Sequence, residues 1–100
     1  MNYSLVLKEE AIADIQFAFD FYDDVAMDLG IRFLDELEHH FDDIKQRPLS
    51  YSFWLDQNLY RSYSLQHFPF SIIFEVSGDE VIVFAVHDHR RLPDKTLNRF

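Results

Sequence analysis

The sequence contains no cysteine and has only two glycines and three prolines. Without cysteine the chain forms no disulfide, and it offers neither a thiolate metal ligand nor a cysteine nucleophile. It has no uncharged apolar run near the roughly 18 residues that a transmembrane helix requires. Its first residues lack the basic segment and apolar run of a secretory signal. We therefore expect a cytoplasmic protein without a membrane partner.

Positive charge is also scarce, since nine Lys and Arg stand against eighteen Asp and Glu and the formal net charge is −9. A general nucleic-acid-binding protein normally has a basic surface, so this composition argues against that class. The acidity is uneven: residues 1–50 hold twelve acidic and four basic side chains, and residues 51–100 hold six and five. From residue 87 onward, basic side chains outnumber acidic ones. Only this C-terminal end offers a local site for phosphate.

Apolar and aromatic side chains are abundant: they make up 48% and 17% of the chain, with eleven phenylalanines. A chain of 100 residues fits one domain, and this share of apolar residues can fill a dense core. No linker, repeat or low-complexity stretch divides it. We therefore expect a single domain over residues 1–100.

The first half of the chain is typical of a short strand followed by two helices. Residues 3–7 have the period of two that predicts a strand. From residue 9, apolar side chains recur at helical spacing, and the predicted buried face is Ile12, Ile15, Phe19, Tyr22, Ala26 and Leu29. Gly30 is expected to end this helix, because glycine adopts the left-handed conformation of a helix C-terminus at low cost. The second helix is predicted by Phe33, Leu34, Leu37, Phe41 and Ile44, and Pro48 blocks its continuation.

The second half predicts three strands, at residues 59–65, 70–76 and 81–87, because it is rich in β-branched and aromatic side chains at a period of two. Residues 77–80 form a short turn between the last two strands. The predicted order is β-α-α-β-β-β, an α+β fold with a helical hairpin packed on one face of a mainly antiparallel sheet. In the last strand, Val81, Val83, Ala85 and His87 are expected to share one face.

Two segments of this second half resemble the RelE/ParE family of toxins. The run from Tyr60 to Val76 has an arginine that opens a strand, an aromatic-proline-aromatic step and an apolar strand that ends in an aromatic, an acidic residue and valine. The last strand runs into a histidine, arginines and a proline, as the family's last strand does. The residues that carry the resemblance are Arg61, Phe68, Pro69, Phe70, Phe74, Glu75, Val76, His87, Arg90, Arg91 and Pro93.

The resemblance implies the toxin of a type II toxin-antitoxin (plasmid stabilization) system, which a cognate antitoxin neutralises by covering its working surface. Two modes of action occur in the family. ParE-like members poison DNA gyrase without chemistry of their own, whereas RelE-like members are endoribonucleases that cut mRNA on the ribosome. The resemblance implies no cofactor and no small-molecule substrate.

Arg61, His87, His89, Arg90 and Arg91 are the candidate catalytic residues. Cleavage of RNA by its own 2′-hydroxyl needs a base, an acid and cations around the phosphate. Arg61 is a candidate phosphate clamp, because its planar guanidinium can hold two phosphate oxygens; its alternative role is pairing at the sheet edge. His87 is either a general acid or base or a core histidine. The other three form part of the site or a solvated basic tail.

The sequence also departs from the pattern of the RNA-cleaving members. It has no lysine between Lys45 and Lys95, where such members usually carry several. The intervening loop instead offers Tyr51, Phe53 and Trp54, which suit hydrophobic contact with a partner. We therefore favour ParE-like action. The alternatives are a RelE-like endoribonuclease and a degenerate, non-toxic interaction protein.

A metal site is weakly indicated by His39 and His40. Adjacent histidines on a helix point about 100° apart and do not share an ion easily, so we expect both on the surface and no metal. Phe17 and Phe21 lie on the side of the first helix away from Phe19. Their position indicates a helix that is covered on two sides or partly exposed for a partner.

Overall fold

The computed structural model describes residues 2–90 and contains two helices on one four-stranded sheet. Its elements in chain order are β1 (Ser4–Leu7), α1 (Glu9–Val25), α2 (Leu29–Gln46), the short 3-10 helix η1 (Pro48–Ser50), β2 (Tyr60–Ser64), β3 (Phe70–Ser77) and β4 (Glu80–Asp88). The predicted order β-α-α-β-β-β is confirmed.

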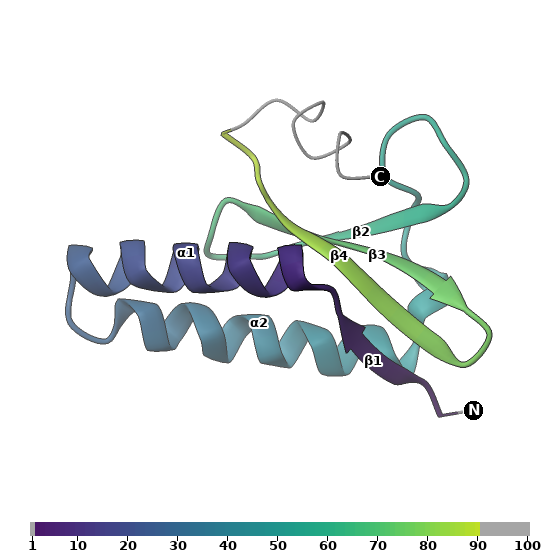
Figure 1. Ribbon diagram of the computed structural model, residues 1–100, viewed down its shortest axis with the longest axis horizontal. Helices are drawn as coiled ribbons and strands as arrows, with labels where there is room; N and C mark the ends of the chain where they lie inside the picture. Colours follow the sequence, from purple (N-terminus) through teal and green to yellow (C-terminus); the bar gives the residue numbers. More distant parts are fainter. Residues whose placement is uncertain (1, 91–100) are drawn as a thin grey trace.

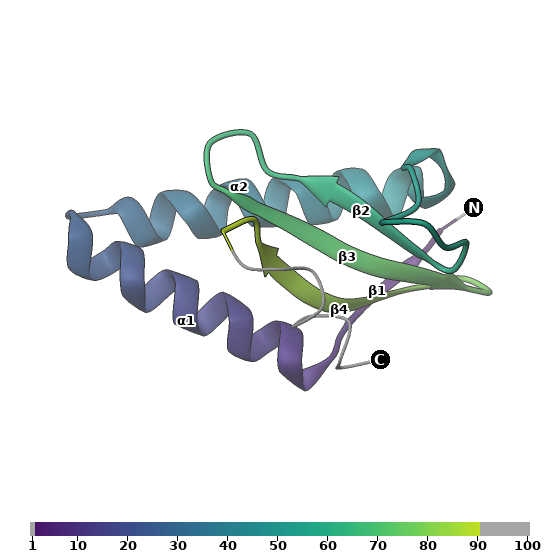
Figure 2. The ribbon, with the colours of Figure 1, turned by 90° about the horizontal axis from the view of Figure 1, so that it is seen from above.

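The strands lie in the order β1-β4-β3-β2. The pairs β2–β3 and β3–β4 are antiparallel, whereas β1 runs parallel to β4. The sheet is therefore mixed, with one parallel pair beside two antiparallel ones. The helical hairpin covers one face of this sheet, and its tip projects beyond the strands (Figures 1 and 2).

The main core lies between the helices and the sheet. It includes an aromatic group built from Tyr22, Phe33, Phe68 and Phe70. The ring of Tyr22 meets that of Phe68 edge-on with 4.9 Å between centroids, and Phe33 meets Phe68 at 5.3 Å. Because edge-to-face pairs add to the free energy of burial, these contacts tie both helices to the sheet. In α2 the predicted apolar residues are buried or half-buried, as expected.

The buried stripe of the first helix matches the predicted one at Tyr22 and Ile15 but not at Ile12. Ala11, Ala18 and Tyr22 are its buried residues, whereas Ile12 is 52% exposed. Alanine has a short side chain, so the helix can approach the sheet closely at these two positions. The prediction of Ile12 as a core residue is therefore wrong.

Gly30 does not end the first helix. The turn lies at residues 26–28, where Asp28 takes the left-handed conformation with φ of 65°, and Gly30 is buried inside α2. A Cβ on Gly30 would lie 2.9 Å from ring carbons of Phe19 and 3.0 Å from the Phe19 carbonyl oxygen. Glycine is needed here because the two helices approach closely, and not because a helix stops.

The last strand contains an irregularity that changes which side chains share a face. Ile73 pairs with Ala85, but the next residue, Phe74, pairs with Val83. Phe84 is therefore an extra residue, and such a bulge reverses the alternation beyond it. Val83 belongs to the core under the helices, whereas Ala85 packs in a second cluster on the opposite face. The prediction of one continuous face up to His87 is wrong for this reason.

Among residues 2–90, neither helix combines the length and the apolar character needed to cross a membrane.

Candidate functional site

Arg61 lies on β2 and is engaged with the loop that precedes this strand. Its Nη1 donates hydrogen bonds to the carbonyl oxygens of Tyr51, at 2.6 Å, and Leu49, at 3.4 Å. Its guanidinium carbon lies 4.1 Å from the ring centroid of Phe53. Because hydrogen bonds from a charged donor are stronger than neutral ones, Arg61 holds this loop against the sheet.

Arg61 and His87 lie on opposite faces of the sheet. Arg61 pairs with Phe74, which belongs to the core under the helices. His87 pairs with Ser71, three residues earlier on the same strand β3. Paired residues share a face and successive residues alternate, so the two side chains point in opposite directions. The structure does not bring these two candidates into one phosphate site.

His87 is buried on the face away from the helices. It is 7% exposed, and its ring lies 5.8 Å from that of Trp54 between centroids. Trp54, Ile73 and Ala85 form the small second cluster beside it. These surroundings are typical of a histidine packed in a core. A general base would need to be accessible to a substrate that arrives from solvent.

His89 sits at the end of β4 next to two serine hydroxyls. Its Nε2 lies 2.6 Å from the Oγ of Ser71, which lies 3.0 Å from the Oγ of Ser64. The main-chain N–H of His89 donates to the carbonyl oxygen of Pro69 at 2.8 Å. These contacts fasten the end of β4 to the β2–β3 hairpin.

Arg90 lies just beyond β4 and is paired with the carboxylate of Asp88, the last residue of that strand. Its Nε and Nη2 donate to the two oxygens of Asp88, each at 2.9 Å, and this contact with the Asp88 carboxylate raises the pKa of Arg90. Its guanidinium carbon also lies 5.8 Å from the ring centroid of Phe21. Arg90 therefore faces α1 with its charge already compensated. Arg91 lies outside the described residues.

The three aromatic residues predicted to contact a partner differ in exposure. Phe53 is 41% exposed and Trp54 is 7% exposed. Tyr51 is half-buried and stacks on Tyr63, with 4.6 Å between the ring centroids. The side chain of Gln57 closes this loop by hydrogen bonds to main-chain atoms on both sides of the turn. Phe53 is therefore open to contact with a partner, whereas Trp54 covers the outer face of the sheet.

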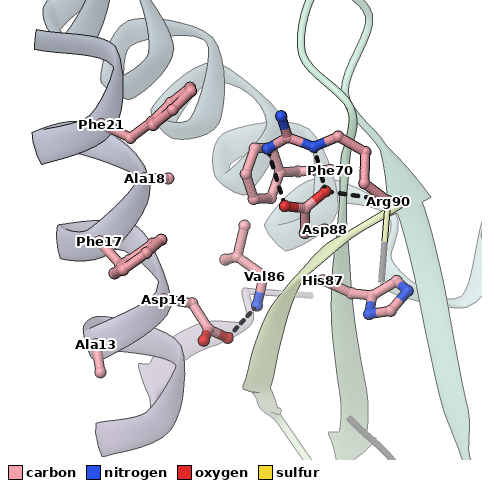
Figure 3. Close-up of a pocket in the computed structure, with 10 residues that line it drawn as sticks. All are labelled: Ala13, Asp14, Phe17, Ala18, Phe21, Phe70, Val86, His87, Asp88 and Arg90. Atoms are coloured by element: carbon pink, nitrogen blue, oxygen red, sulfur yellow. Dashed lines mark hydrogen bonds and ion pairs between the residues drawn. The ribbon is translucent and has the colours of Figure 1, made fainter. Parts of the chain in front are cut away.

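A groove of about 540 Å³ lies between α1 and the C-terminal half of β4 (Figure 3). Phe17 and Phe21 border it on α1, and Phe70 and Val86 border it on the sheet. The two phenylalanines of the helix are 67% and 46% exposed. Asp14 lies at the end of the groove, where its Oδ2 accepts a hydrogen bond of 3.0 Å from the N–H of Val86. Of the two alternatives predicted for this side of the first helix, partial exposure is therefore the one that holds.

A polar cluster joins α2 to the loop between β2 and β3. Glu36 accepts hydrogen bonds from the His40 Nε2 at 2.9 Å, the His67 Nδ1 at 2.8 Å and the Gln66 N–H at 2.5 Å. Burial by itself would raise the pKa of this carboxyl. The hydrogen bonds lower the pKa by more than burial raises it, and the resulting pKa is about 2. His40 is 3% exposed, so the expectation that both adjacent histidines lie on the surface is wrong for His40.

Several of these residues were not singled out as functional candidates from the sequence. Glu36 and His40 are four residues apart on a helix, a spacing at which side chains meet, so this pair could have been found. Nothing in the sequence distinguishes Asp14 or Ser71 from other polar residues. Within residues 2–90, no group of three or more acidic or histidine side chains is arranged to hold a metal ion.

The fold and the groove define an α+β protein whose helical hairpin leaves apolar surface exposed beside one edge of the sheet. The structure is similar to a solved structure described as the chromosomal ParDE TA system from P. aeruginosa. The TM-score is 0.73 at 20% sequence identity, and the match covers 86% of this chain and 95% of that chain. At this identity the likeness shows the fold. No curated protein matches the chain significantly by sequence.

The family is shown by the sequence itself. The family model described as "ParE toxin of type II toxin-antitoxin system, parDE" matches residues 5–93. The chain therefore belongs to the ParE toxin family of type II toxin-antitoxin systems.

Proposed function

We propose that this protein is the toxin of a toxin-antitoxin pair and that it acts by binding DNA gyrase rather than by cutting RNA. A cognate antitoxin neutralises it in the cytoplasm. Membership of the ParE family supports the toxin role and the antitoxin partner. The choice of gyrase over ribosome-bound mRNA depends on the positions of the candidate catalytic residues.

The separation of Arg61 from His87 carries the proposal. A ribonuclease of this size needs a base, an acid and a phosphate-binding cation within reach of one phosphodiester. Here Arg61 and His87 lie on opposite faces of the sheet. The guanidinium of Arg61 already donates to main-chain carbonyl oxygens, and Trp54 packs against His87. This arrangement favours a binding protein over an enzyme.

The groove between α1 and β4 supports neutralisation by a second protein. Exposed large apolar side chains gather beside it on α1, notably Phe17 and Phe21. Contiguous apolar surface of this kind marks protein-protein contact sites. A partner segment that fills the groove would also cover the end of β4, where His87 and Arg90 lie.

Induced expression in cells without the antitoxin tests the proposal. We expect growth arrest with DNA damage and intact RNA, followed by recovery when a cognate antitoxin is co-expressed. Fragmented mRNA would instead support the endoribonuclease. Normal growth would support a degenerate interaction protein and would contradict the toxin role.

A further inference from the structure

A pocket of about 510 Å³ lies between α2 and the loop that joins β2 to β3. Arg32, Glu36 and His39 line it from α2, and they lie on one side of the helix because they are three or four residues apart. His67 and Phe68 line it from the loop. Small-molecule sites commonly measure roughly 300–1,000 Å³, so this pocket is large enough for a small organic ligand.

The carboxylate in this pocket is already engaged by hydrogen-bond donors. Oε1 of Glu36 lies 2.8 Å from the Nδ1 of His67, and Oε2 lies 2.9 Å from the Nε2 of His40 and 2.5 Å from the main-chain nitrogen of Gln66. An ionised carboxylate only accepts hydrogen bonds, so each of these nitrogens carries a hydrogen. Glu36 therefore holds the loop to α2 and is not an open ligand for a metal ion.

The contact with Glu36 fixes the ring of His67 and leaves its second nitrogen without a hydrogen bond to any other residue in the range 2–90. The side chain of His67 is 76% exposed, and Nε2 lies on the edge of the ring away from the bonded Nδ1. Proteins commonly orient a ligand-binding histidine by holding one ring nitrogen on a carboxylate. His67 is therefore positioned to contact a ligand through Nε2.

Arg32 and His39 supply further donors. Within the described part of the chain, neither side chain makes a hydrogen bond or an ion pair, and the ring of His39 meets only that of His40, at 6.2 Å between centroids. Both side chains are exposed. Arg61, by contrast, is held by carbonyl oxygens. The guanidinium of Arg32 and the ring of His39 are therefore free to bind a ligand.

These open groups determine the charge of the ligand. Arginine is always cationic, and its guanidinium can hold two oxygens of one phosphate. Histidine takes up a proton near neutral pH and then donates from both ring nitrogens. A metal ion would be repelled by Arg32, whereas a phosphate would be bound by three side chains. Leu29 and Phe68 add apolar surface to the pocket, which suits the organic part of a phosphorylated molecule.

We propose that this pocket binds a small phosphorylated molecule of the size of a nucleoside monophosphate. Arg32, His39 and His67 hold the phosphate, Glu36 positions His67, and the apolar surface contacts the rest of the ligand. The inference assigns binding and no bond cleavage. It is independent of the toxin function, because the binding is measured on the purified protein without antitoxin or target.

Amide NMR spectra of the full-length protein at about pH 6 and low salt test the proposal with three probes. We expect adenosine monophosphate to shift the resonances of residues 29–40 and 66–68 until they saturate, and adenosine to shift none of them at the same concentration. Inorganic phosphate should shift the same residues at higher concentrations, and equal binding of both phosphates would overturn the role of the apolar surface. Unshifted resonances with both phosphates, or equal binding of adenosine, would overturn the proposal.

Matched variants locate the phosphate. Arg32→Ala should weaken binding of adenosine monophosphate roughly tenfold or more, and His39→Ala roughly fivefold. Arg47→Ala removes the same charge from an exposed residue at the other end of α2 and should leave binding unchanged. Neither Arg32 nor His39 bonds to the rest of the described chain, so both variants should unfold at the wild-type temperature. Equal losses in Arg32→Ala and Arg47→Ala would mean that overall charge governs binding, and would overturn the assigned site.

Discussion

Replacing Glu36 by glutamine should destabilise the fold by breaking the link between α2 and the β2–β3 loop. One carboxylate there accepts hydrogen bonds from His40, His67 and the Gln66 N–H. Glutamine has a single acceptor oxygen. Its amide group –NH₂ is a donor and would face the other N–H donors, which would then have no acceptor. Because buried donors left without an acceptor are costly, we expect the variant to lose stability at pH 7.

The magnitude follows from the pKa of Glu36, which is lowered from 4.5 to about 2 in the folded protein. This difference corresponds to about 3 kcal/mol at full strength. His67 is largely exposed, so screening by solvent reduces the expected loss to roughly 1–3 kcal/mol. For a domain of this size, each kcal/mol lowers Tm by roughly 4–8 °C.

The pH dependence has a definite sign. Because the folded pKa lies below the unfolded one, the carboxylate contributes its full stability above pH 4.5, and this contribution is lost as the pH falls from 4.5 toward about 2. Urea unfolding at several pH values should show the wild type losing more stability in this window than Glu36→Gln does. Glu38→Gln, at an exposed position of the same helix, is the control. Parallel pH profiles for wild type and Glu36→Gln would refute the reasoning.

Three further changes test the fold and the site. Gly30→Ala should destabilise the protein by about 1–2 kcal/mol, because the strain of the contact with Phe19 exceeds the gain in helix propensity; thermal unfolding measures it, and a stabilised variant would contradict the close approach. Trp54→Ala should cost about 3–4 kcal/mol by opening a cavity on the outer face of the sheet, and a loss within error would mean that this loop does not pack there. Arg61→Ala should lower the free energy of unfolding by about 1–2 kcal/mol, because the hydrogen bonds to the carbonyl oxygens of Tyr51 and Leu49 are lost. The variant should remain toxic in a growth assay. If a folded variant is not toxic, Arg61 acts as a phosphate clamp after all.

The helical hairpin could be predicted from the sequence where one periodic stripe dominates. In α2, Phe33, Leu37 and Ile44 lie at helical spacing, and all are buried. In α1, apolar residues occur on two sides, so periodicity alone does not decide which side meets the sheet. The buried side is the one with Ala11 and Ala18, because short side chains permit close packing.

The bulge in β4 could not be predicted in the same way. The apolar run of this strand continues without a break through Val83, Phe84 and Ala85. Nothing in the chemistry of these side chains marks one of them as an extra residue. The shift arises from pairing with β3, where Phe74 meets Val83. Pairing depends on contacts distant in the sequence, and it moves His87 to the outer face.

The role of Arg61 shows a similar limit for the site. An arginine that opens a strand suits a phosphate clamp and a loop anchor equally well, since both use the same donors. The choice depends on where the preceding loop returns, and that loop places the carbonyl oxygens of Tyr51 and Leu49 beside the guanidinium. Phe17 and Phe21 could be recognised from the sequence, because their side of α1 is apolar without being the core side.

The most direct test of binding to gyrase rather than RNA cleavage uses purified components. DNA gyrase and plasmid DNA are incubated with the protein, and a parallel reaction contains ribosomes translating a labelled mRNA. We expect inhibited supercoiling or accumulation of cleaved plasmid in the first reaction and intact mRNA in the second. Unaffected gyrase together with cleaved mRNA would contradict the account.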